Sequence, residues 1–442
     1  MLKFGTDGVR GVANSELTPE LVLALGRAAA RVLPSSRYVI GRDTRRSGPL
    51  LEAALTAGLT SEGVDVVRLG VVPTPTVAWL AQRDGVLGAV ISASHNSFED
   101  NGIKLFALGG NKLTDEQEEA LEAELRTVLA DPAARPARTG ADLGTVTDDP
   151  DAATRWMESV VASAEGRGLD GLRVVVDCAN GAATQVGPKV LRALGAQVEV
   201  LHADPDGTNI NAGCGSTHPD DLQRTVVQTG ADVGIAFDGD ADRMLAVDAT
   251  GRLIDGDQII AITAIDRKAR GVLTGDAVVV TVMTNLGFRL GMEARGIEVV
   301  EVPVGDRHVL AALAERGLSL GGEQSGHVVF ADLASTGDGL LTAVQLLDVM
   351  VHSGRPLGVL ADEAMTRLPQ VLRNVRVQRP GAEVAAEVEA SAAAAALELG
   401  DHGRVLLRPS GTERLVRVMV EAPTVEQAEA VADRLAAEVA AR

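Results

Sequence analysis

The chain has 442 residues, of which 46% are hydrophobic and 23% charged, a composition typical of a soluble globular protein with about three domains. Lys and Arg total 41 against 61 Asp and Glu, so the formal net charge is −20. Nucleic acid and anionic membranes repel a chain this acidic when it carries no concentrated basic run, so we expect neither as a partner. Aromatic residues make up only 2%, so the cores must consist mainly of Ala, Val, Leu and Ile.

Cysteine content and the N-terminal segment bear on the compartment. The two cysteines, Cys178 and Cys214, form no CxxC motif, which favours a reducing environment. The first residues lack the apolar core of a secretory signal, and no apolar run approaches the roughly 20 residues that cross a bilayer. We therefore expect a soluble cytoplasmic protein.

Three segments of the chain share one pattern, in which a β-rich run, a polar turn, a helical stretch and a second β-rich run follow one another. Short β-branched runs that flank a helix predict parallel strands in βαβ units. The expected strand, helix and strand are 38–43, 48–62 and 64–67 in the first copy, 173–178, 183–194 and 197–200 in the second, and 277–281, 285–294 and 297–300 in the third.

A further short strand follows each unit and leads into a polar loop. These loops are 92–96, 238–242 and 323–327. In open α/β sheets, ligands bind beyond the carboxyl ends of the strands. The three loops could therefore converge on one cleft, although three unrelated turns are the alternative.

The tail of the chain has a different pattern, with expected helices at 382–397 and 425–440 around expected strands at 404–408 and 415–420. This predicts a smaller α+β domain. The stretches 130–150 and 366–376 are interpreted as connectors. The predicted domains are 1–150, 151–252, 253–367 and 368–442.

The strongest chemical signal is the group Asp238, Asp240 and Asp242, which follows an apolar run. Alternate residues of an extended segment face one side, so three carboxylates would crowd together and repel one another unless a cation neutralises them. Oxygen ligands suit Mg²⁺ or Ca²⁺. An EF-hand is excluded because Arg243 stands where its glycine is required and Ala249 where its glutamate is required. A solvated Asp/Gly turn is the alternative.

Ser94 lies in the first polar loop, without a G-x-S-x-G motif around it. Adjacent residues of an extended chain face opposite ways, so His95 is a poor candidate for the base of a catalytic triad. A loop serine near a carboxylate-bound Mg²⁺ is better placed to carry a phosphoryl group. The alternative is a serine that only caps a turn.

The segment 408–413 combines an arginine, two hydroxyl side chains and a glycine turn. Open backbone N–H groups and a guanidinium can hold a phosphate, and Arg417 adds charge from the following strand; a plain hairpin turn is the alternative. Neither a Walker A sequence nor G-x-G-x-x-G is present, so nucleotide-driven chemistry lacks support. Among the histidines, His308 and His327 are the best placed to face a polar ligand.

Taken together, these motifs resemble those of the α-D-phosphohexomutase family, over the whole chain and in the expected order. The matching motifs are Phe4-Gly-Thr-Asp-Gly-Val-Arg-Gly11, Ile91-Ser-Ala-Ser-His-Asn96 with Asp100-Asn-Gly-Ile-Lys104, Asp238-Gly-Asp-Ala-Asp-Arg243, Gly322-Glu-Gln-Ser-Gly-His327 and Arg408-Pro-Ser-Gly-Thr412.

The resemblance implies an α/β fold with four domains around a central cleft, three related α/β domains and a smaller C-terminal α+β domain. It also implies a phosphoserine at Ser94 and one Mg²⁺ held by that serine and the three aspartates. The remaining roles that it implies are charge stabilisation or proton handling for Arg10, Lys104 and Arg243, sugar binding for His308, Glu323, Ser325 and His327, and phosphate binding for Arg408, Ser410, Gly411, Thr412 and Arg417.

The glucosamine branch of the family is favoured by the segment 5–10 and by Gln324, where mannose and glucose relatives commonly carry Met. The expected reaction interconverts glucosamine 6-phosphate and glucosamine 1-phosphate through a 1,6-bisphosphate, which also acts as activator, and feeds UDP-N-acetylglucosamine and cell-wall synthesis. The expected partner is a phosphosugar, and a family-like homodimer is consistent with the resemblance.

Three alternatives stay open at this point. The first is a mannose- or glucose-phosphate mutase of the same family. The second is a Mg²⁺-dependent sugar-phosphate phosphohydrolase with Asp238 as nucleophile, and the third is a non-enzymatic protein that binds a metal or a phosphosugar.

Two positions depart from the family pattern. Ser97 and Arg414 stand where the family usually has proline. Because proline restricts the backbone angle φ, we expect less intrinsic stiffness in these two loops.

Overall fold

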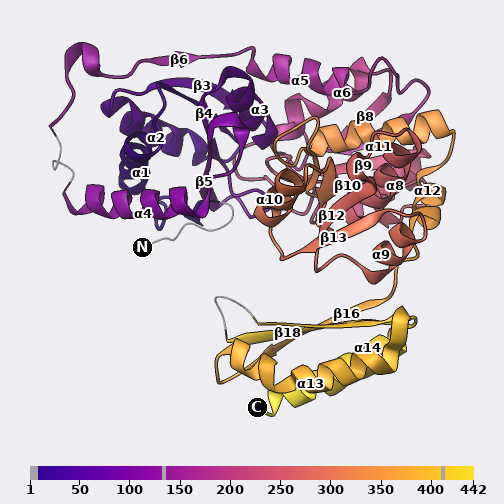
Figure 1. Cartoon of the computed structure of the whole chain (residues 1–442). Helices are drawn as coiled ribbons and strands as arrows, with labels where there is room; N and C mark the ends of the chain where they lie inside the picture. The colour runs from indigo at the N-terminus through magenta and orange to yellow at the C-terminus, as the bar shows by residue number, and fades with distance from the viewer. Residues whose placement is uncertain (1–7, 132–135, 410–413) are drawn as a thin grey trace. The chain divides into compact units, whose positions relative to one another are not determined.

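The computed structural model describes residues 8–131, 136–409 and 414–442. The chain divides into two compact units, a larger one of Met1–Val282 with Val300–Ala361 and a smaller one of Met283–Val299 with Asp362–Arg442. Across the described residues the strands form four sheets, three of them mixed and interleaved with helices and the fourth antiparallel (Figure 1). The fold is thus the four-domain α/β arrangement predicted from the sequence.

The first sheet has the strand order β1-β5-β4-β2-β3-β6, with β2, β3, β4 and β6 parallel and β5 antiparallel to β4. Successive residues of β2 face opposite sides of the sheet. Tyr38 and Ile40 pack with α1, α2 and α4, whereas Val39 packs with α3. Burial on both faces explains the continuous apolar runs. The elements are β1 (Val9–Val12), α1 (Pro19–Val32), β2 (Arg37–Arg42), α2 (Gly48–Ser61), β3 (Asp65–Val71), α3 (Thr74–Asp84), β4 (Leu87–Ile91), β5 (Asp100–Phe106), α4 (Asp115–Ala130) and β6 (Val146–Asp148).

The second sheet has the order β11-β10-β9-β7-β8. The strand β7 pairs in parallel with β8 and β9, and β10 returns antiparallel to β9. All residues of β9 are buried, so this strand is central and its carboxyl end opens into the aspartate loop. The elements are α5 (Ala152–Ala162), β7 (Arg173–Asp177), α6 (Gly187–Ala193), β8 (Gln197–Leu201), α7 (Asp220–Thr229), β9 (Val233–Phe237), β10 (Met244–Asp248) and β11 (Leu253–Ile254).

The third sheet has the order β13-β12-β14-β15, with β12 and β14 parallel and β15 antiparallel to β14. The loop between β14 and β15 is the predicted sugar-binding loop. The elements are α8 (Gly256–Ala269), β12 (Ala277–Thr281), α9 (Leu286–Glu293), β13 (Glu298–Val302), α10 (Asp306–Arg316), β14 (Leu320–Gly322), β15 (Val328–Phe330), α11 (Gly339–Ser353) and α12 (Leu357–Ala364).

The fourth sheet is antiparallel in the order β16-β18-β17, and α13 and α14 share its apolar core. This is the smaller α+β domain predicted for the tail. Its elements are β16 (Gln370–Arg376), α13 (Gly381–Leu399), β17 (Arg404–Pro409), β18 (Leu415–Glu421) and α14 (Val425–Ala440).

Three local expectations were wrong. The stretch 130–150 contains β6, whose three residues are exposed but pair in parallel with β3; an exposed edge strand carries no apolar signal. The stretch 366–376 contains β16, which pairs with β18 along its whole length. The helix expected over 183–194 begins at Gly187, because a separate 3₁₀ turn precedes it and Pro188 occupies its first turn.

Candidate active site

Ser94 lies in the loop after β4, and its side chain is wholly buried. Its backbone φ is 53°, in the left-handed region that serine seldom adopts. The Ser94 hydroxyl donates a hydrogen bond to Oδ2 of Asp238, 2.5 Å away. The loops after β4 and β9, which belong to different sheets, therefore meet at these two residues.

His95 lies closer to Ser94 than the alternation argument predicts. Its Nδ1 is 3.5 Å from the Ser94 hydroxyl oxygen, because the left-handed turn at Ser94 brings both side chains to the same side. Burial lowers the pKa of His95, and the positive charges of Arg243 and Arg10 lower it further. His95 is thus a neighbour of Ser94 that was not predicted from the sequence.

Asp238, Asp240 and Asp242 form a buried cluster in which one oxygen of each lies within 4.8 Å of the others. The three carboxylates lie close together as predicted, but the segment that carries them is not the extended strand from which this was predicted. The segment is a turn, with a left-handed Ala241 at φ 56°. Burial raises the pKa of Asp238 well above its ordinary value, and the charges of Asp242 and Asp240 raise it further.

Two side chains from the first sheet's domain contact this cluster. Lys104, on β5, donates from Nζ to Oδ2 of Asp240 at 2.7 Å and to Oδ2 of Asp242 at 3.1 Å. Thr74, at the start of α3, donates from Oγ1 to the same Asp240 oxygen at 2.6 Å and from its backbone N–H to the Asp240 carbonyl at 2.9 Å. Only a helix-start pattern marks Thr74 in the sequence, so its contact with the aspartate loop was not predictable from it.

The residues present fit a divalent cation. Oδ1 of Asp240 is buried and has no hydrogen-bond partner among residues 8–131, 136–409 and 414–442. Three buried carboxylates so close together repel one another strongly, and an all-oxygen donor set of this kind suits Mg²⁺. The Ser94 hydroxyl adjoins the cluster through Asp238 and could supply a fourth oxygen.

Two predicted arginines flank the site. Arg243 donates its backbone N–H to Oδ1 of Asp238 at 3.3 Å, and its Nε lies 3.7 Å from Oδ1 of Asp242. Arg10 lies on β1 opposite Gly102 of β5. A Cβ at position 102 would approach the Arg10 side chain to 2.8 Å, so the glycine leaves room for the arginine to cross the strand.

The predicted sugar-binding loop is a tight turn joined to the start of α10. The Glu323 N–H donates to the His327 carbonyl at 2.9 Å, and Oε1 of Glu323 accepts from the Gly305 N–H at 3.1 Å. Ser325 is exposed at the tip, and His308 is half-buried on the first turn of α10. The loop 323–327 and the start of α10, which carries His308, therefore lie next to each other.

The His327 side chain lies in the interior below this loop and is only 1% exposed. A Cβ at Gly337 would lie 2.3 Å from its Nε2, so the ring packs directly on that glycine. Nε2 is 3.5 Å from Oδ2 of Asp306, which also pairs with Lys112. In this structure the imidazole faces the protein rather than the surface.

The predicted phosphate-binding segment lies in the smaller unit. Arg408 on β17 is paired in register with Arg417 on β18. Burial lowers the pKa of Arg408, and the neighbouring charge of Arg417 lowers it further. Ser410, Gly411 and Thr412 lie outside the described residues.

Comparison with known proteins identifies the family. Models of the phosphoglucomutase/phosphomannomutase family match four successive segments, alpha/beta/alpha domain I at 1–130, domain II at 154–251, domain III at 255–368 and the C-terminal domain at 372–438. The chain belongs to the phosphoglucomutase/phosphomannomutase family. The resemblance noted in the sequence is therefore confirmed.

Relatives within this family are similar over nearly their whole length. The chain is 57% identical to a phosphoglucosamine mutase of Saccharopolyspora erythraea over 99% of both chains. It is 56% identical to that of Frankia alni, over 99% of this chain and 98% of the relative. A solved phosphoglucomutase/phosphomannomutase family protein from Burkholderia thailandensis is 27% identical, with a TM-score of 0.84 over 100% of this chain and 98% of that one.

No helix within residues 8–131, 136–409 and 414–442 combines the length and apolar character needed to cross a membrane.

Proposed function

We propose that the chain is a phosphoglucosamine mutase that interconverts glucosamine 6-phosphate and glucosamine 1-phosphate through a phosphoserine at Ser94. The observation that carries the chemistry is the 2.5 Å contact between the Ser94 hydroxyl and Asp238, beside a carboxylate cluster suited to a divalent cation. The choice of an amino sugar rests on relatives that are 53–57% identical and carry that name.

In the proposed reaction, phosphorylated Ser94 gives its phosphoryl group to a free hydroxyl of the sugar monophosphate. The bond between phosphorus and the serine oxygen breaks, a bond to the sugar oxygen forms, and the sugar hydroxyl loses its proton. The resulting 1,6-bisphosphate turns end over end, and its other phosphate returns to Ser94. The same bisphosphate serves as activator of unphosphorylated enzyme.

One Mg²⁺ per chain, held by Asp238, Asp240, Asp242 and the phosphoserine, would neutralise charge on the transferring group. Lys104 contacts two of these carboxylates, and its ammonium stabilises the charge that accumulates near Asp240 and Asp242. Arg10 and Arg243 supply further positive charge. The proton that the sugar hydroxyl loses ends on the Ser94 oxygen, whose bond to phosphorus has broken, and Arg10 and Lys104 are the side chains proposed to assist this transfer.

The rest of the proposed site holds the sugar. Glu323 and Ser325 exchange hydrogen bonds with sugar hydroxyls in both orientations, with His308 and His327 nearby. For Arg408, Ser410, Gly411, Thr412 and Arg417 we propose phosphate binding, as the resemblance to the family implies.

The proposed setting is the cytoplasm, where the product would enter UDP-N-acetylglucosamine and cell-wall synthesis. The absence of a cysteine pair suited to a disulfide framework supports a reducing compartment. We also propose a homodimer, which sedimentation at micromolar concentration would test.

The phosphoserine is tested by substituting Ser94→Ala and supplying bisphosphate activator. Turnover should disappear, and phosphopeptide mapping of the wild-type protein should find phosphate on Ser94. Ser61→Ala, at the carboxyl end of α2, is the matched control and should retain wild-type turnover. Normal turnover by the Ser94→Ala protein would refute the phosphoserine mechanism.

The substrate assignment is tested by comparing kcat/KM for glucosamine 1-phosphate, glucose 1-phosphate and mannose 1-phosphate on phosphorylated enzyme. We expect a clear preference for the amino sugar. A preference for glucose or mannose would assign the other branch of the family, and release of inorganic phosphate without isomer formation would indicate a phosphohydrolase.

A further inference from the structure

Arg45 lies in the turn between β2 and α2 and is only 1% exposed. Each of the five N–H groups of its guanidinium has an acceptor. Nε donates to Oδ2 of Asp43 at 2.8 Å, which balances the buried charge. The other four N–H groups meet backbone carbonyls of a single loop, those of Ser94 and Asn96 at 2.9 Å, Asp100 at 3.0 Å, and Ser97.

A second side chain contacts the same loop from the second domain. Asn211, in the segment between β8 and α7, donates from Nδ2 to the carbonyls of Ser94 and Asn96, each at 2.9 Å. These two carbonyls therefore accept one hydrogen bond from Arg45 and one from Asn211. The loop is held from both domains that contribute to the serine–aspartate contact.

The N–H group of Ser94 is held as well. It donates to Oγ of Ser92 at 2.9 Å, and that hydroxyl donates to Oδ2 of Asp43 at 2.7 Å. With both backbone polar groups of Ser94 held, its left-handed conformation is maintained although that conformation is strained for a residue other than glycine. The direction of the Cα–Cβ bond, and with it the place of the hydroxyl beside Asp238, follows from this backbone.

We infer that Arg45 and Asn211 are positioning residues, which hold the backbone of loop 94–100 so that Ser94 presents its phosphoryl group at one fixed point. The inference rests on the proposed function. In that function Ser94 gives a phosphoryl group to one end of the sugar and later takes the phosphate from the other end, so both transfers need the Ser94 oxygen at the same position. A misplacement of about 1 Å can reduce a reaction rate about 10²-fold.

The inference also bears on Ser97, which stands where the family usually has proline. The backbone restriction that proline would supply is absent here, but the backbone carbonyl of residue 97 still accepts from Arg45. Side-chain hydrogen bonds to the backbone thus provide the stiffness of this loop.

Only arginine can fill this position. Its planar guanidinium has five donors in a fixed geometry, whereas lysine has three donors on one nitrogen. If Arg45 acted through its charge alone, lysine would replace it. If it acts by holding four carbonyls, lysine would restore little.

The test compares kcat, KM for glucosamine 1-phosphate and the melting temperature of three variants with those of the wild-type protein. Arg45→Lys should lower kcat about 10²-fold with KM within about twofold, since neither positioning residue contacts substrate in the proposed site. Asn211→Gly should lower kcat about tenfold; it removes the amide, and glycine accepts the φ of 58° at this position without strain. The matched control is Arg31→Lys, at an arginine whose side chain is 4% exposed and pairs with Glu62 and Glu124; this variant should lose stability but keep wild-type kcat.

Wild-type kcat in Arg45→Lys, or a rise in KM at constant kcat, would overturn the inference. If the melting temperature of Arg45→Lys is well below that of the control, its kcat cannot be attributed to positioning alone, and the Asn211→Gly variant then provides the test. An unchanged kcat in Asn211→Gly would also overturn the inference. Failure of the proposed function is recognised separately, because the wild-type protein itself would then not convert glucosamine phosphates.

Discussion

At the scale of single residues, the proposed site depends on side chains that orient Ser94 and the three aspartates. Thr74 is the clearest example, because its hydroxyl donates to an oxygen of Asp240 that Lys104 also contacts. A carboxylate whose one oxygen is held in this way has its other oxygen, Oδ1, fixed in direction. Thr74 would therefore set the geometry of the proposed cation site without being a ligand itself.

We predict that Thr74→Val weakens activation by Mg²⁺ about tenfold, because removing a partner that orients a metal ligand typically reduces metal affinity 10–100-fold. Activity measured against Mg²⁺ concentration gives the affinity. The matched control is Thr76→Val, since the buried Thr76 hydroxyl has no hydrogen-bond partner within the described parts of the chain. Equal Mg²⁺ dependence in both variants would contradict the proposed role of Thr74.

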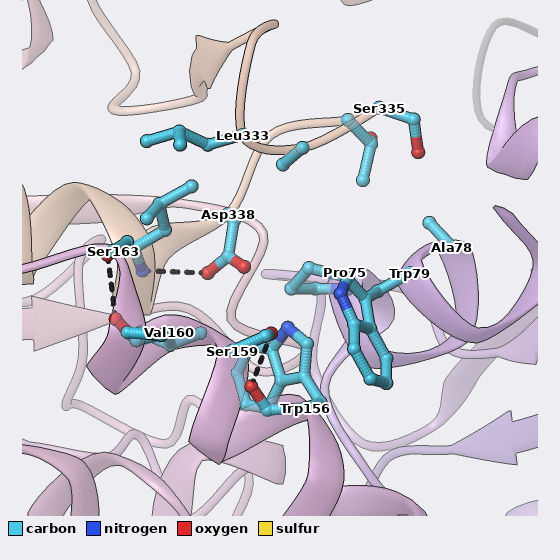
Figure 2. Close-up of a pocket in the computed structure, with 14 residues that line it drawn as sticks. Pro75, Ala78, Trp79, Trp156, Ser159, Val160, Ser163, Leu333, Ser335 and Asp338 are labelled. Atoms are coloured by element: carbon cyan, nitrogen blue, oxygen red, sulfur yellow. Dashed lines mark hydrogen bonds between the residues drawn. The ribbon is translucent and has the colours of Figure 1, made fainter. Parts of the chain in front are cut away.

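A second residue-scale feature is Asp338, which lies on the wall of a cavity of about 260 Å³. Both tryptophans of the chain, Trp79 and Trp156, line the same cavity (Figure 2). Asp338 caps α11 by accepting from the Leu341 N–H at 2.9 Å. Burial raises its pKa to about 7, although the hydrogen bonds it accepts oppose this shift.

Because the pKa of Asp338 is higher in the folded than in the unfolded chain, the protonated form favours folding. Its contribution to stability is complete below about pH 4 and is lost at up to about 1.4 kcal/mol per pH unit until the pH passes about 7. We predict that Asp338→Asn, which retains the helix cap, raises the melting temperature at pH 8 relative to wild type and has a smaller effect at pH 5. Tryptophan fluorescence is the natural readout, and an equal shift at both pH values would contradict the prediction.

At the scale of elements, the fourth sheet contains a buried ion pair that joins its strands. Arg404 on β17 donates from Nε to Oε2 of Glu421 on β18 at 2.9 Å. Glu421 is fully buried and also accepts from the Leu286 N–H and from Gln370 on β16. Burial raises the pKa of Glu421 and the charge of Arg404 lowers it, so the carboxylate depends on the arginine.

We predict that Arg404→Met destabilises the smaller unit by about 3–5 kcal/mol, because it leaves a buried carboxylate without its counter-charge. Combining it with Glu421→Gln should recover much of that loss, since no charge then stays buried. Denaturant unfolding of the two single variants and the double variant measures the coupling. A double variant no more stable than Arg404→Met would contradict this account.

At the scale of the whole molecule, much of the fold was predictable because strands and helices alternate with clear apolar periodicity. The polar loops after β4, β9 and β14 were also predictable, and they are the proposed site loops because ligands bind beyond strand ends. Residues such as Arg45, Asn211 and Thr74 were not. Their partners in the loops around Ser94 and Asp240 lie 49 or more positions away in the chain, and nothing in their local sequence signals a contact with these loops.

Other features were missed for local reasons. The left-handed backbone at Ser94 reverses the side-chain alternation on which the argument about His95 depended. The aspartates come together in a turn and not along an extended strand. The exposed strand β6 has no apolar pattern from which it could have been predicted.

The net charge of −20 is compatible with a small anionic substrate. Part of the acidity is a buried cluster suited to a cation, whereas the phosphates of a small substrate would be met by arginines such as Arg408 and Arg417. An excess of acidic residues therefore argues against a large polyanion as partner without arguing against an anionic sugar.

The central claim is that Ser94 passes a phosphoryl group to one end of the amino sugar and recovers the phosphate from the other end. It is tested most directly by mixing enzyme that carries radioactive phosphate on Ser94 with unlabelled glucosamine 1-phosphate. We predict that the label leaves the protein and appears in glucosamine 6-phosphate, while unlabelled phosphate stays on Ser94. Formation of glucosamine 6-phosphate with all of the label still on the protein, or release of the label as inorganic phosphate, would contradict it.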